Sequence, residues 1–161
     1  MLRLARDRDH NIRIQRQLLK DFFNEASDDL YGAAKAGDLP MCQTLLANGV
    51  DVNHRSSANN YTPLQTASLA GRTPIVKLLI NSGALVNSTD NIGNTPLHAA
   101  AQEGHLDTAR LLVNSGARTD AAQRRGGMPI HLAAQNNRHQ ILTYLVTEAG
   151  VSVNVVSTAT S

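Results

Sequence analysis

Two histidines and a glutamate lie close together in one stretch of the chain, and these residue types can transfer protons or bind metal ions. His98, Glu103 and His105 fall within "NTPLHAAAQEGHLDTARLLVNSGARTD", which starts at residue 94. A zinc site needs ligands at a regular spacing such as HExxH, and an enzyme needs an acid-base pair held in a cleft. Gly104 separates the two histidines, and the chain has one cysteine, Cys42. We therefore expect no metal ion, no cofactor and no catalytic residue.

The same pattern recurs along the chain at a fixed interval. "YTPLQTASLAGRTPIVKLLINSGALVN" begins at Tyr61, the stretch above begins at Asn94, and "GMPIHLAAQNNRHQILTYLV" begins at Gly127, 33 residues later each time. Upstream, "DLYGAAKAGDLPMCQTLLANGVDVN" matches at an offset of 34. His98 and His131 occupy the same place in this repeat, and Gln65 fills it in another copy. A residue that recurs with the repeat is expected to support the scaffold, because a catalytic residue has no reason to recur at that interval.

Each repeat has the signals of two short helices followed by a loop. Thr95 can cap a helix whose first residue is Pro96, and Gly104 ends that helix. Residues 106–113 give a second helix an apolar face, which Gly116 terminates. The polar, turn-rich segments between repeats predict extended, hairpin-like loops.

The period, the TPLH-type tetrapeptide, the Gly-His pair after the first helix and the "LLxxGAxxN" ending resemble the ankyrin repeat. The resemblance implies an all-α ankyrin-repeat solenoid over residues 28–154. Copies that depart from the pattern carry Asp28 as the expected first cap, Gln65 in place of histidine, and Met128 in place of threonine. The expected repeats span about 28–56, 57–89, 90–122 and 123–154, with a tail at 155–161.

Residues 1–27 lie outside the repeats. The apolar side chains between 11 and 26, among them Phe22 and Phe23, predict an amphipathic helix. This helix would either cap the first repeat or dock on a partner. Six basic residues in the first twenty also leave open an alternative function, in which this segment binds an anionic surface or nucleic acid and the repeats are a structural part of a larger protein.

Composition limits the remaining classes of function. The net charge is +2 and there is no tryptophan, so we do not expect nucleic-acid binding by the repeats to be the main role. Neither a membrane-spanning apolar run nor a secretory signal is present, and the single Cys42 suits a reducing compartment and a place in the core. We expect an intracellular protein, cytoplasmic or nuclear, that is monomeric in isolation and binds no small-molecule substrate.

The resemblance implies a protein-protein interaction module that binds its partner on a concave face, as an adaptor, scaffold or regulatory inhibitor. It also marks Asn53 as a candidate site of asparagine hydroxylation, through the pattern Leu45, Asp51, Val52 and Asn53. Partner-contacting positions carried over from the family flank the loop tips and the ends of the first helices. They are Lys35, Ala58, Asn59, Tyr61, Leu69, Asn91, Ile92, Asn94, Gln102, Glu103, Arg124, Arg125, Gln135 and Asn136.

Overall fold

The computed structural model describes residues 13–15, 17–18, 28–57 and 59–151. Residues 13–15 and 17–18 are helical, and Ile14 and Leu18 are exposed. The rest of the helix expected over 11–26 lies outside the described residues, as does the tail 155–161. Its packing on the first repeat therefore stays a prediction.

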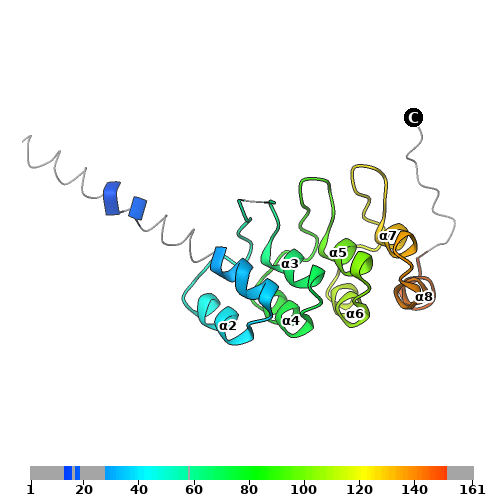
Figure 1. Cartoon of the computed structure of the whole chain (residues 1–161), viewed down its shortest axis with the longest axis horizontal. Helices are drawn as coiled ribbons and strands as arrows, with labels where there is room; N and C mark the ends of the chain where they lie inside the picture. Colours follow the sequence, from blue (N-terminus) through cyan, green and yellow to red (C-terminus); the bar gives the residue numbers. More distant parts are fainter. Residues whose placement is uncertain (1–12, 16, 19–27, 58, 152–161) are drawn as a thin grey trace, which may run out of the picture.

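Helix pairs fill the described part of the chain from residue 28 onward, and no strand occurs among the described residues. Figure 1 shows the pairs stacked in chain order along the long axis, with the first helices in one row, the second helices in another, and the long loops projecting on the side of the first row. This arrangement confirms the predicted all-helical solenoid. The elements are a helical segment at 28–36, α2 (Leu39–Ala47), α3 (Pro63–Leu69), α4 (Thr73–Asn81), α5 (Pro96–Glu103), α6 (Leu106–Asn114), α7 (Pro129–Gln135) and α8 (His139–Thr147).

The first helices begin where the threonine-proline signals place them. At α3 the Thr62 hydroxyl accepts a hydrogen bond from the Gln65 backbone N–H at 3.2 Å, and the Gln65 Oε1 accepts one from the Thr62 N–H at 2.9 Å. This reciprocal bonding satisfies two amides that a helix start leaves unpaired. The prediction that Asp28 caps the first of these helices is wrong. Asp28 is itself helical, so it lies within the helix and not at a cap position outside it.

The core forms between successive helix pairs and repeats with them. Leu30, Leu64 and Leu97 occupy equivalent positions and are almost fully buried. Alanines that are buried completely, Ala67 in α3 and Ala100 in α5, let neighbouring first helices approach closely. Because each apolar face is covered by the next pair, a single repeat has no core of its own.

Cys42 belongs to this core, as predicted. It lies in α2, has no exposed surface and joins the main apolar cluster. Burial raises the pKa of its thiol to about 11, with Asp38 adding to the shift. The thiol is therefore protonated at neutral pH and behaves as a small apolar side chain.

A row of hydrogen bonds ties the end of each first helix to the following repeat. The residue just before a second helix donates from a side-chain nitrogen to a backbone carbonyl near the end of the preceding first helix. These bonds satisfy carbonyls that a helix end leaves without partners. The pairs are Arg72 Nε with Lys35 O at 3.4 Å, His105 Nε2 with Leu69 O at 3.0 Å, and Arg138 Nε with Gln102 O at 2.9 Å.

Two glycines with the same backbone conformation test this row of bonds. Gly104 and Gly116 have φ of 90° and 91°, but an added Cβ would lie 2.8 Å from Arg138 Cδ at Gly104 and would meet nothing within 4 Å at Gly116. We expect Gly104→Ala to cost about 1 kcal/mol more than Gly116→Ala, because Arg138 must shift and lose its bond to Gln102. Urea denaturation followed by circular dichroism measures both values.

The control is the same pair of substitutions in an Arg138→Ala background. There the two alanines should cost nearly equal free energies of unfolding, because the obstructing side chain is gone. An unchanged difference between them in that background would contradict the proposed role of Arg138.

Candidate functional site

His98 is fully buried and holds two parts of the backbone together. The Thr95 N–H donates to His98 Nδ1 at 3.1 Å, so Nδ1 carries no proton. The opposite nitrogen, Nε2, donates to the Gly127 carbonyl at 3.1 Å. Burial lowers the pKa of the imidazole, which favours the neutral ring that these bonds require. His98 thus links α5 to the loop of the next repeat.

Gln65 makes the same pair of contacts one repeat earlier. Its Oε1 accepts from the Thr62 N–H, and its Nε2 donates to the Asn94 carbonyl at 2.8 Å. An amide that does not titrate therefore replaces the histidine without changing the geometry. This equivalence supports a scaffold role for His98 and explains how Asn94 and Gly127, in successive loops, are positioned.

The other two members of the cluster do not converge with His98. His105 Nε2 donates to the Leu69 carbonyl, and Glu103 Oε1 accepts from Gln102 Nε2 at 3.1 Å. Glu103 Oε2 also lies 3.9 Å from Arg138 Nη2. Within the described ranges, no group of three or more His, Cys, Asp or Glu side chains could hold a metal ion.

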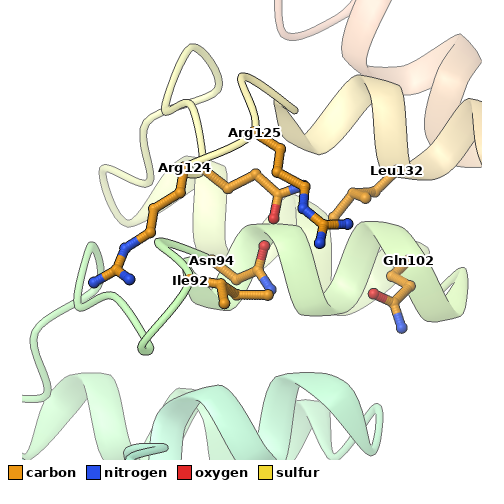
Figure 2. A pocket seen from close by; sticks show the side chains of 7 residues that line it. Ile92, Asn94, Gln102, Arg124, Arg125 and Leu132 are labelled. Carbon is orange, nitrogen blue, oxygen red and sulfur yellow. The ribbon is translucent and has the colours of Figure 1, made fainter. Parts of the chain in front are cut away.

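A pocket of about 390 Å³ opens where α5 meets the loop before α7. Five of the residues around it were predicted from the sequence as partner contacts, and two more, Gln123 and Leu132, were not (Figure 2). Leu132 directly follows the TPLH-type motif, at a position expected in the core. The sequence therefore contains no signal that this residue borders the pocket. The five predicted residues are Ile92, Asn94, Gln102, Arg124 and Arg125.

Asp90 shapes the loop that forms one wall of this pocket. Its Oδ1 accepts from the backbone N–H groups of Ile92 at 2.9 Å and Asn94 at 2.8 Å, and its Oδ2 accepts from Asn94 Nδ2 at 3.2 Å. The Arg124 N–H donates to the Ile92 carbonyl at 2.9 Å and so joins this loop to the next one. The loop therefore holds Ile92 in place although 52% of its surface is exposed.

The pocket carries positive charge that the described residues do not neutralise. Arg124 and Arg125 are exposed, and neither forms an ion pair with a described residue. Figure 2 shows the Arg125 side chain extending over α5 toward Leu132, whereas Arg124 extends to the other side, past Ile92. Arg125 is therefore the cation directed over the pocket.

A second depression, of about 160 Å³, adjoins the first on the side of α3. Tyr61, Leu69 and Glu103 line it, and it shares Asn94 and Gln102 with the first pocket. Tyr61 and Leu69 were expected as apolar side chains facing solvent, but both are half-buried. Their partial burial reflects packing between successive repeats, which the sequence pattern does not specify.

Other predicted contact residues lie outside both depressions. Asn91 is exposed at a loop tip, where its Oδ1 accepts from Asn60 Nδ2 at 2.9 Å. Asn136 is exposed after α7, and its Nδ2 donates to the Leu132 carbonyl at 2.9 Å. Ala58 is outside the described residues. The remaining positions, Lys35, Asn59 and Gln135, do not line either depression.

Comparison with protein families identifies this architecture. A family model for ankyrin repeats, in three copies, matches residues 30–123 and again 93–157. The chain belongs to the ankyrin-repeat family. Members of this family generally mediate protein-protein interactions, and the helix pairs with projecting loops in Figure 1 fit that assignment.

Curated relatives of this ankyrin-repeat chain share short segments with it. It is 34% identical over 64 residues to Dauer abnormal formation protein 25 of Caenorhabditis elegans, which is 40% of this chain and 16% of that protein. It is 40% identical over 60 residues to the 2-5A-dependent ribonuclease of Mus musculus, 37% of this chain and 8% of that protein. It is 40% identical over 52 residues to the Ankyrin repeat and SAM domain-containing protein 6 of Rattus norvegicus, which is 32% of this chain and 6% of that protein. The matches thus cover small parts of much longer proteins.

Asn53 makes a bridge between repeats. Its Nδ2 donates to the Gly83 carbonyl at 3.2 Å, and its Oδ1 accepts from the Leu85 N–H at 2.8 Å. Asn87 makes the equivalent bonds one repeat later. The Asn53 amide therefore already has a structural role, which any modification of this residue must accommodate.

The buried imidazole predicts a pH dependence of stability. His98 has a lowered pKa in the folded chain, so below about pH 6.5 the unfolded chain binds the proton first and the free energy of unfolding falls. In His98→Gln this contribution should disappear, while stability at pH 7.5 stays within about 1 kcal/mol because Gln65 shows that an amide makes the same bonds. Urea denaturation between pH 5 and 7.5 measures the slope, to which one proton contributes at most about 1.4 kcal/mol per pH unit.

Exposed His139 provides the matched control, and His139→Gln should leave the slope below pH 6.5 nearly as in the unmodified chain. Equal slopes for the unmodified chain and His98→Gln would contradict this account of His98.

Proposed function

We propose that this chain is a non-catalytic module that binds a partner protein on its loop face, as an adaptor, scaffold or regulatory inhibitor. The loop face is defined here as the first helices α3, α5 and α7 with the loops that precede them. We take it to be the concave face expected from the ankyrin resemblance. The observation that carries the proposal is the pair of adjoining depressions on this face, which meet at Asn94 and Gln102.

The side chains around these depressions have the composition of a protein-binding surface. Tyr61 and Arg125 belong to residue types that contribute most often to binding hot spots. Exposed Ile92 and half-buried Leu69 add apolar area that a partner can cover. The Asp90 carboxylate accepts hydrogen bonds that fix its loop, and Gln65 and His98 donate to carbonyls in the following loops. A partner would therefore meet a surface that is already formed, which lowers the ordering cost of binding.

Nothing in the described residues favours a catalytic role over this one. One relative is by its name a ribonuclease, but the match covers 8% of that protein. No described helix is long and apolar enough to cross a membrane. We further propose that the chain acts in the cytoplasm or nucleus and is monomeric in isolation, as its composition suggests.

Asn53 remains our proposed site of hydroxylation. Mass spectrometry of peptides from the native protein should find a fraction of Asn53 carrying one added oxygen atom. Asn87, which makes equivalent bonds, is the internal comparison. Native material with no added oxygen on Asn53 would contradict the proposal.

The protein-binding role predicts a defined loss of partner capture. Affinity purification with the intact chain identifies the partners, and Tyr61→Ala combined with Arg125→Glu should then reduce capture at least tenfold, because both residues line the loop face. Pull-down with the purified partner measures this, and circular dichroism melting should show a nearly unchanged transition.

A matched double variant, Leu85→Ala with Lys77→Glu, makes the same kinds of change at exposed positions that line neither depression. It should capture partners as well as the unmodified chain does. Equal capture by both double variants would place binding elsewhere and so overturn the proposed function.

A further inference from the structure

The pocket on the loop face has an unbalanced charge. Arg124 and Arg125 line it, and no aspartate or glutamate does. Two other described arginines have close acidic partners: Arg110 lies 2.6 Å from Glu148, and Arg118 lies 3.1 Å from Asp120. Arginine stays protonated in proteins, so the charge at the pocket does not depend on neutral or mildly acidic pH. An anionic group from outside the described residues would complement it.

The surroundings of Arg125 indicate what else the occupant contains. Ile92, which is 52% exposed, supplies most of the apolar surface beside the guanidinium, and Leu132, which is 9% exposed, lines the pocket wall next to it. Asn94 beside Ile92, and Gln102 farther along α5, carry side-chain amides that can donate to and accept from a peptide backbone (Figure 2). Cation, amide and aliphatic groups therefore lie along one short path over α5 (Figure 2).

A nucleic-acid backbone fits this lining less well than an acidic peptide does. Phosphates would satisfy the arginines, but no aromatic side chain lines the pocket to stack against a base. A guanidinium can bind a carboxylate through two parallel hydrogen bonds, and the aliphatic side chains match an aliphatic neighbour of that carboxylate.

The two depressions carry opposite charges, and this difference would orient a bound segment. The adjoining depression is lined by Asp90 and Glu103 and by no arginine or lysine. A carboxylate would be repelled there and attracted to the side of Arg125. A segment that spans both depressions is therefore expected to carry its acidic residue at the end over α5 and α7.

We propose, resting on the protein-binding function above, that the partner presents an extended segment in which an aspartate or glutamate is next to, or one residue away from, an aliphatic residue. The carboxylate binds the Arg125 guanidinium, and the aliphatic side chain packs on Ile92 and Leu132. The amides of Asn94 and Gln102 hydrogen-bond the backbone of that segment. The partner segment has no acidic residue over Tyr61 and Leu69.

Selection from a random peptide library tests this chemistry without a known partner. The intact chain is the target, and Lys77→Glu is the control for the same change of charge at an exposed position on α4. We expect the unmodified chain and Lys77→Glu to enrich peptides with an acidic residue beside an aliphatic one. With Arg125→Glu this preference should be lost.

A charge exchange on one selected peptide sharpens the test. Replacing its acidic residue by lysine should weaken binding to the unmodified chain by about tenfold or more, the usual effect of losing a charge-assisted hydrogen bond. The same lysine peptide should bind Arg125→Glu more tightly than the acidic peptide does. Fluorescence anisotropy measures the affinities, and circular dichroism confirms that each variant is folded.

The outcomes separate this inference from the proposed function. One outcome is that the selected peptides lack acidic residues and yet bind Ile92→Ala at least tenfold more weakly than they bind the unmodified chain. That result would overturn the proposal that the partner segment is acidic, but it would support protein binding on the loop face. If no peptide is selected, or if binding is insensitive to both Ile92→Ala and Arg125→Glu, both proposals fail. Binding of a mixed-sequence oligonucleotide that is lost in Arg125→Glu, without any acidic preference among peptides, would assign the pocket to nucleic acid and overturn the inference.

Discussion

The structure depends on the contact between one helix pair and the next. Each pair is too thin to enclose a core, so Leu64 and Leu97 become buried only when neighbouring pairs stack. Fully buried alanines at positions 67 and 100 allow the first helices to come close enough for this. The spacing between pairs then determines where the loops stand relative to one another. The loop face is therefore a consequence of core packing, although its own side chains contribute little to that core.

Hydrogen bonds between repeats convert this spacing into a definite arrangement of side chains. Gln65 and His98 each reach from a first helix to a carbonyl in the following loop, at Asn94 and Gly127. Arg138 reaches in the opposite direction, to the end of α5. The pocket lies among these bonds, so its walls come from two successive repeats that are fixed at both the loop and the helix end. Substitutions at such bridging residues would change the pocket without touching its lining.

The sequence predicted the features that recur in every repeat, but not the features that depend on how two neighbouring repeats pack together. Period and helix signals correctly placed the first and second helices and the burial of Cys42. Ile92 and Arg125, which the family resemblance marked at loop-tip positions, line the pocket, but their contact with a partner stays a prediction. Leu132 is buried, and it was missed because its place in the pocket wall depends on how α7 lies beside the preceding loop; Tyr61 is more covered than expected for the same reason. Such relations join residues about thirty positions apart, where the local pattern carries no information about distance.

Asn94 and Gln102 belong to both depressions, so the two hollows share a wall. A single strand laid across that wall would engage the second hollow as soon as it had engaged the first. The second contact then forms within one molecule, at an effective concentration set by the short tether rather than by the concentration of the partner in solution. Two individually weak contacts can in this way give one firm attachment. Cutting the strand between them would cost far more affinity than trimming either end.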